Sequence, residues 1–123
     1  MKPIYLDHAA TTPVRKEVLQ AMLPYFSKKF GNASSLHSLG VEARNALESA
    51  RESLAKNLNS RADEIIFTSG ATEANNFALK GTFFAQKNSG KNHLIISAVE
   101  HSCIMETASW LSKMGAVISI APV

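Results

Sequence analysis

Apolar positions recur at the helical period in the first half of the chain. In the segment 38–57, Leu47 and Leu54 fall on one face with charged residues between them, which predicts an amphipathic helix. A second helical pattern begins at Val14, and Pro24 is expected to end or kink that helix. The first half of the chain is therefore predicted to be helical after a short N-terminal arm.

Beyond residue 64 short apolar runs alternate with helical patterns. The runs typical of buried strands are 65–68, 94–97 and 117–120, and the helical patterns between them cover 72–86 and 102–114. Strands that alternate with helices of this length indicate right-handed βαβ units and a parallel sheet covered by helices. The predicted fold class is α/β.

The same patterns divide the chain into three parts. We expect an N-terminal arm over 1–14, a helical segment over 15–60, and the start of a parallel-sheet domain over 61–123. The sequence stops directly after the last strand-like run. Because a parallel strand is normally covered on both faces, we expect this last domain to be truncated.

Composition narrows the class of protein. The chain is 46% hydrophobic and 19% charged, which is typical of soluble globular domains. The net charge of +3 comes from scattered basic residues, whereas a nucleic-acid binder concentrates them on one face. No apolar run has the length that crosses a bilayer, and the N-terminus turns polar too early for a signal peptide. A single cysteine suits a reducing compartment, so we expect a cytoplasmic protein with neither a nucleic-acid nor a membrane partner.

The turn Ser69-Gly70-Ala71 joins a predicted strand to a helix that opens near Thr72. Free backbone N–H groups and the positive end of the helix dipole form an anion site at such a junction. The Thr72 hydroxyl adds one more donor, although Thr72 alone, or Ser69 with Thr72, is equally explained as a helix cap. The lysine of a nucleotide P-loop and the glycine spacing of a dinucleotide fingerprint are both absent.

His101 follows the predicted strand 94–97, at the carboxyl end where open α/β sheets bind ligands. The turn at Gly70 also follows a strand, so both are expected at one edge of the sheet. A histidine in this position stacks on a flat ring or moves protons near neutral pH. The alternative is a capping or solvent-exposed histidine, and the pattern leaves both open.

Other reactive side chains give weaker signals. Cys103 lies in the first turn of a predicted helix, where a packed small residue is favoured over a nucleophile. Lys80 falls late in a helix, which predicts a solvated side chain, and none of the lysines lies in an apolar strand–loop setting suited to a Schiff base. Three further histidines show no metal-ligand spacing, so no zinc site is expected: His8, His37 and His93.

Four segments in order resemble the cysteine desulfurase family. They are YLDHAATTP at 5–13, FGNASSLH at 30–37, EIIFTSGATEANN at 64–76, and Glu100-His101. One departure is Ala33, where the family commonly has proline. The resemblance implies a partial fold of the type I pyridoxal-phosphate (PLP) transferases, with an N-terminal arm and helices followed by βαβαβ units.

The resemblance also implies an activity and roles for particular residues. Family members are homodimers that take sulfur from L-cysteine, leave alanine, and pass a persulfide to iron–sulfur or other thiol-based pathways. By position, Ala71 and Thr72 resemble ligands of the PLP phosphate, and His101 resembles the residue that stacks on the cofactor ring and helps in proton transfer. The segments 7–12 and 31–35 are expected near the substrate pocket.

Family members are much longer than this chain, and most of the expected chemistry lies beyond Val123. The Schiff-base lysine, the aspartate that pairs with the pyridine nitrogen, the sulfur-accepting cysteine and the substrate-binding arginine all belong to that missing portion or to a split partner. The 123 residues alone are therefore expected to be inactive. The alternatives are a non-catalytic remnant that binds a phosphate ligand or a partner protein, and a portion of a selenocysteine lyase or related aminotransferase-like enzyme.

Overall fold

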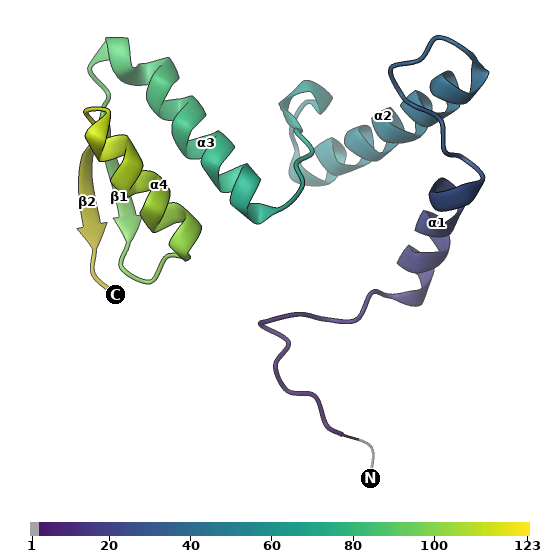
Figure 1. Ribbon diagram of the computed structural model, residues 1–123, viewed down its shortest axis with the longest axis horizontal. Coiled ribbons are helices and arrows are strands. Elements are labelled where there is room, and N and C mark those ends of the chain that lie inside the picture. The colour runs from purple at the N-terminus through teal and green to yellow at the C-terminus, as the bar shows by residue number, and fades with distance from the viewer. Residues whose placement is uncertain (1–2) are drawn as a thin grey trace. The chain divides into compact units, whose positions relative to one another are not determined.

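The computed structural model describes residues 3–123, and the chain separates into two compact units, Met1–Ile65 and Ile66–Val123. The first unit is helical, and the second contains a small parallel sheet with two long helices (Figure 1). Among the described residues no helix combines the length and the apolar character that crossing a bilayer requires.

The first unit contains the helices α1 (Lys16–Ser27) and α2 (Ser38–Leu58), followed by the short 3-10 helix η1 (Ala62–Glu64). Helix α2 confirms the prediction over 38–57. It ends at Asn59, which adopts the left-handed conformation with φ 53° and ψ 44°. The Asn59 backbone N–H donates to carbonyl groups of the last helical turn.

We expected Pro24 to end or kink helix α1; the helix continues through Pro24, so Pro24 does not end it, and the kink stays a prediction. A proline removes only its own N–H from the helical ladder, while its carbonyl remains an acceptor. Here the Pro24 carbonyl accepts from the N–H groups of Lys28 and Lys29, at 2.9 and 2.8 Å. The last turn closes on these bonds.

The loop between α1 and α2 lies against the start of α2. A Cβ atom at Gly31 would be 2.1 Å from the Leu39 carbonyl oxygen, and one at Gly40 would be 2.3 Å from the Ser35 carbonyl oxygen. Arg44 Nη2 donates to the Ser35 carbonyl at 3.3 Å. The two glycines thus allow the loop to approach the helix closely, and the Arg44 hydrogen bond holds it there.

The second unit contains α3 (Ala71–Gln86), the 3-10 helix η2 (Lys87–Ser89), β1 (His93–Ser97), α4 (Ser102–Lys113) and β2 (Val117–Ala121). The two strands pair in parallel, from His93 opposite Val117 to Ser97 opposite Ala121. Figure 1 shows α4 connecting β1 to β2. The α/β class with a parallel sheet is confirmed.

The core of this unit lies where the two long helices meet one face of the sheet. Leu111 of α4 is fully buried and packs with Phe83 of α3 and with Ala116, which precedes β2. Leu94 and Ile118, which are partners in the strand register, close the cluster from the sheet.

The expected strand at 65–68 does not form. This segment runs into α3 without joining the sheet, which has only β1 and β2 within the part of the chain that the structure describes. Ile66 and Phe67 are 59% and 44% exposed. An apolar run becomes a strand only where a second strand completes its hydrogen bonds, and among the described residues no strand pairs with this segment.

Candidate functional site

The first turns of α3 and α4 line a cavity with a volume of about 540 Å³. Ala71 and Thr72 contribute from α3, and His101 and Cys103 contribute from the start of α4. The structure therefore brings together the three residues that the sequence singled out: Ala71, Thr72 and His101. All of them belong to the second compact unit.

Gly70 is the N-cap residue of α3, and no side chain caps this helix. Within residues 3–123, the backbone N–H groups of Ala71, Thr72 and Glu73 have no hydrogen-bond partner, and neither has the Thr72 hydroxyl. The interpretation of Thr72 as a cap, alone or with Ser69, was therefore wrong. Free donors at the positive end of a 16-residue helix are suited to an anion.

The carboxylate of Glu73 is turned back onto Ser69. It accepts from the Ser69 backbone N–H at 2.6 Å and from the Ser69 hydroxyl at 2.7 Å. The side-chain hydrogen bond, and then the backbone one, lower the pKa of Glu73 below its usual 4.5. The negative charge at this turn is thus held on Ser69.

Ser69→Ala is expected to raise the pKa of Glu73 toward 4.5, since the hydroxyl bond is the larger cause of the depression. A carboxyl whose folded-state pKa is depressed stabilises the fold above its unfolded-state pKa, and this stabilisation is lost as the pH falls through the folded value. Acidification should therefore weaken the unsubstituted protein more than the variant. NMR titration of the Glu73 carboxyl carbon measures the shift. The control is Ser112→Ala, because within the described residues the Ser112 hydroxyl donates to the Ser109 carbonyl alone. Equal Glu73 titrations in the two variants would contradict the assignment.

His101 both caps α4 and lines the cavity. Its Nδ1 accepts from the Cys103 backbone N–H at 3.2 Å, and the residue is exposed. Among the described residues, Nε2 has no hydrogen-bond partner. The two interpretations left open by the sequence are therefore compatible, because capping uses one ring nitrogen and leaves the other.

Two asparagines that the sequence analysis did not single out connect α3 to α4, and the first of them, Asn75, lines this cavity. Asn75 Nδ2 donates to Cys103 Sγ at 3.3 Å. Asn76 Oδ1 accepts from the Thr107 hydroxyl at 3.0 Å, and its Nδ2 donates to the Thr72 carbonyl at 3.0 Å. Thr107 is only 4% exposed, so its hydroxyl requires this partner. The one sequence signal that could have indicated this network is the pair of adjacent asparagines, Asn75 and Asn76, near the start of a predicted helix.

The sequence predicted a solvated side chain for Lys80, but in the structure this side chain contacts an aromatic ring. Its Nζ lies 4.7 Å from the centre of the Trp110 ring, in the geometry of a cation–π contact. No lysine is among the described residues that line the cavity at the helix starts. A covalent anchor for a cofactor is therefore not provided by this wall.

The remaining histidines have separate local contacts. His8 packs edge-on against the Tyr5 ring, His37 accepts from the Gly40 N–H at the start of α2, and His93 Nε2 lies 2.8 Å from the Ser119 hydroxyl. In the described part of the chain, no three His, Cys, Asp or Glu side chains are grouped to hold a metal ion.

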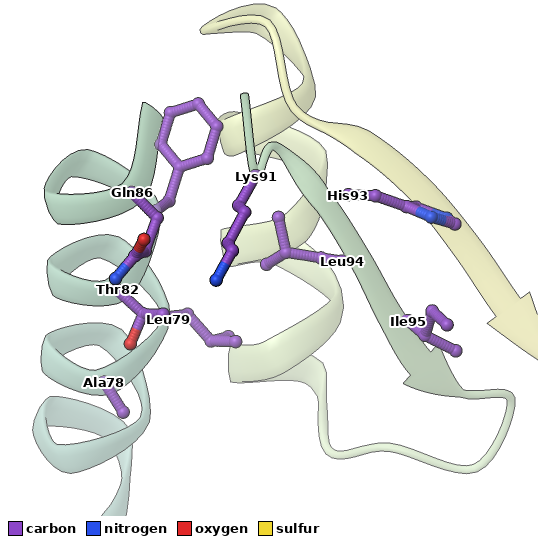
Figure 2. A pocket seen from close by; sticks show the side chains of 9 residues that line it. Ala78, Leu79, Thr82, Gln86, Lys91, His93, Leu94 and Ile95 are labelled. Atoms are coloured by element: carbon purple, nitrogen blue, oxygen red, sulfur yellow. The ribbon is translucent and has the colours of Figure 1, made fainter. Parts of the chain in front are cut away.

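A second cavity of about 370 Å³ lies between α3 and β1. Figure 2 shows Leu79 of α3 and Leu94 of β1 on either side of it, with the Lys91 side chain between them. Its walls are mainly apolar and it lacks a helix start with free donors. We therefore assign the candidate site to the cavity beside Thr72 and His101.

Comparison with known proteins gives consistent matches along the chain. The family model "Aminotransferase class-V" matches residues 4–123. The chain is 52% identical over 122 residues to a cysteine desulfurase IscS of Dictyoglomus turgidum, covering 99% of the chain and 31% of the relative. It is 45% identical to the cysteine desulfurase IscS of Methanosarcina thermophila, with 99% and 30% covered.

Solved structures match with similar coverage. A NifS-like protein superposes with a TM-score of 0.89 and 38% identity, covering 98% of this chain and 33% of that one. A structure described as SspA in complex with cysteine gives a TM-score of 0.84 and 42% identity, with 94% and 33% covered. The chain thus spans about a third of the length of the relatives it matches.

Proposed function

The chain belongs to the class-V aminotransferase family, and on this premise we propose that it supplies one wall of the cofactor site in a PLP-dependent cysteine desulfurase. The observation that carries the proposal is the cavity in which unpartnered donors of Ala71 and Thr72 lie together with His101. We also propose the domain division expected from the sequence: an arm over 1–14, a helical segment over 15–60, and the cofactor-binding part over 61–123.

The residues at the start of α3 fit the phosphate of PLP. Among residues 3–123 the N–H groups of Ala71 and Thr72 and the Thr72 hydroxyl are donors without partners, and a phosphate offers ionised acceptors. Glu73 does not oppose this binding strongly, because its carboxylate is held on Ser69. These residues would bind and orient the phosphate end of the cofactor.

His101 would lie against the cofactor ring and exchange a proton through Nε2, the nitrogen that the cap leaves free. When bound, PLP supplies an electron sink for charge that develops on the substrate. The protein residues of this wall orient the cofactor and hold the proton-exchanging group beside it.

The substrate is proposed to be L-cysteine, converted to L-alanine with the sulfur kept as a persulfide for iron–sulfur or other thiol-based assembly. Relatives named cysteine desulfurase and the cysteine-bound SspA structure support this choice over selenocysteine. We place the Schiff-base lysine, the pyridine-pairing aspartate and the sulfur-accepting cysteine outside these 123 residues. This placement is supported by relatives about three times as long and by the cavity wall without lysine. The complete enzyme is proposed to be a cytoplasmic homodimer.

Complementation tests the proposal. The chain is mixed with the part of the Dictyoglomus turgidum relative that follows the matched region, together with PLP and L-cysteine. We expect the absorbance band of bound PLP and the release of sulfide and alanine, whereas neither polypeptide alone should turn over cysteine. A mixture that binds PLP but stays inert would favour a non-catalytic phosphate-binding module. The specific observation that supports this alternative is that no lysine is among the described residues lining the cavity. A mixture that binds no PLP would refute both.

A further inference from the structure

A hydrogen bond joins the first turns of α3 and α4 at the cavity. Asn75 Nδ2 donates to Cys103 Sγ at 3.3 Å, and the Cys103 backbone N–H donates in turn to His101 Nδ1 at 3.2 Å. We infer that Asn75 is a positioning residue for His101, which fixes the start of α4 against α3 and thereby fixes the imidazole in the cavity wall. The inference rests on the proposed function, in which His101 faces the cofactor ring.

The contact made by Asn75 differs in kind from the cap made by His101. The bond between His101 and Cys103 spans two residues, so it orients the ring relative to α4 alone. The bond from Asn75 spans 28 residues and links α4 to the helix that carries Ala71 and Thr72. Only a bond of the second kind sets the position of the imidazole relative to the phosphate-facing turn.

A second connection, farther along α4, supports the same arrangement. Asn76 accepts from the buried Thr107 hydroxyl and donates to the Thr72 carbonyl. It therefore holds α4 one turn beyond Cys103 and leaves the beginning of the helix to Asn75. Because sulfur is a weak acceptor, the contact of Asn75 is expected to contribute to position more than to global stability.

The arrangement determines which nitrogen of His101 carries the proton. Since the Nδ1 lone pair accepts from the Cys103 N–H, the neutral ring is protonated at Nε2. The Nε2–H group is then the ring donor that faces a bound group. Without the bond from Asn75 to Cys103, the first turn of α4 loosens and the Cys103 N–H no longer stays directed at Nδ1, so both neutral tautomers are populated.

Histidine labelled with ¹⁵N reports this tautomer directly, and the measurement requires neither PLP nor turnover. In the full chain, with the imidazole in its neutral form, we expect His101 to be protonated at Nε2 alone. Asn75→Ala should move the two ring nitrogens toward averaged shifts. Cys103→Ala, which removes the acceptor, should do the same, whereas Cys103→Ser retains an acceptor and should preserve the Nε2–H signature.

The matched control is Asn57→Ala. Asn57 Nδ2 donates to the Ser53 carbonyl at 2.9 Å within α2. This variant therefore removes an asparagine hydrogen bond that does not connect two helices. Its His101 spectrum should equal that of the unsubstituted chain. The double variant Asn75→Ala with Cys103→Ala should resemble either single variant, because both remove one interaction.

The binding of PLP gives an independent second measurement. Asn75→Ala is expected to weaken it about three- to tenfold, the effect of one modest hydrogen bond. An unchanged tautomer in Asn75→Ala, or a Cys103→Ser variant that behaves like Cys103→Ala, would overturn the positioning role. Failure of the unsubstituted chain to bind PLP in the complementation mixture would instead refute the proposed function, and the tautomer would still decide the role of Asn75.

Discussion

Thr72→Val is expected to weaken PLP binding in the complementation mixture about 10- to 150-fold, because a hydrogen bond to a charged group contributes about 1.5–3 kcal/mol. Valine keeps the size and the β-branching of threonine but lacks the hydroxyl. The hydroxyl has no partner among the described residues, so its removal leaves no protein group unsatisfied and the fold should be retained. Titration with PLP, followed by fluorescence or calorimetry, measures the change in affinity.

Thr82→Val is the matched control for Thr72→Val. It makes the same substitution in the same helix, but Thr82 does not line the cavity beside His101. Its affinity for PLP should stay within about twofold of the unsubstituted value. Inorganic phosphate should compete with PLP in the unsubstituted mixture, and less effectively when Thr72 is valine. Equal PLP affinities in the two valine variants would show that Thr72 does not bind the phosphate.

Leu111→Ala is expected to lower the free energy of unfolding of the second unit by about 2–5 kcal/mol. The Leu111 side chain is fully buried between Phe83 and the sheet, so its truncation loses packing and leaves a cavity. Since small domains have only about 5–15 kcal/mol of stability, a loss of this size is a large fraction of the total. Denaturant unfolding, monitored by circular dichroism, measures the shift in midpoint.

The comparison variant is Leu36→Ala. Leu36 is 89% exposed, so the same truncation removes little packing and should change the stability by less than about 0.5 kcal/mol. A similar loss in both variants would show that the core around Leu111 does not stabilise the chain more than a surface leucine does.

The elements that depend on local pattern were predictable from the sequence. The helix α2 repeats its apolar residues at the helical period, and its end at Asn59 follows from a residue type that accepts the left-handed conformation. The partial PLP-transferase-like fold implied by the four motifs is also confirmed, by the NifS-like structure that covers 98% of the chain. In contrast, the run 65–68 has the composition of a strand, but strand formation depends on a partner that local composition does not specify.

The site was predictable in part. The turn at Gly70 and the histidine at 101 were placed at one edge of the sheet, and the structure does bring them to one cavity. It does so through the starts of α3 and α4, without the first of the expected strands. Asn75 and Asn76 were missed because their partners, Cys103 and Thr107, are 28 and 31 residues away. Such contacts depend on the rotation of both helices, which no local pattern records.

The close approach of the loop at Gly31 to the start of α2 restricts which side chains this region can carry. The obstacles at Gly31 and Gly40 are main-chain carbonyls, which no change of rotamer can move aside. A side chain at either glycine would therefore have to displace the backbone itself. The path of the loop and the first turn of the helix thus depend on each other, and neither can shift without the other.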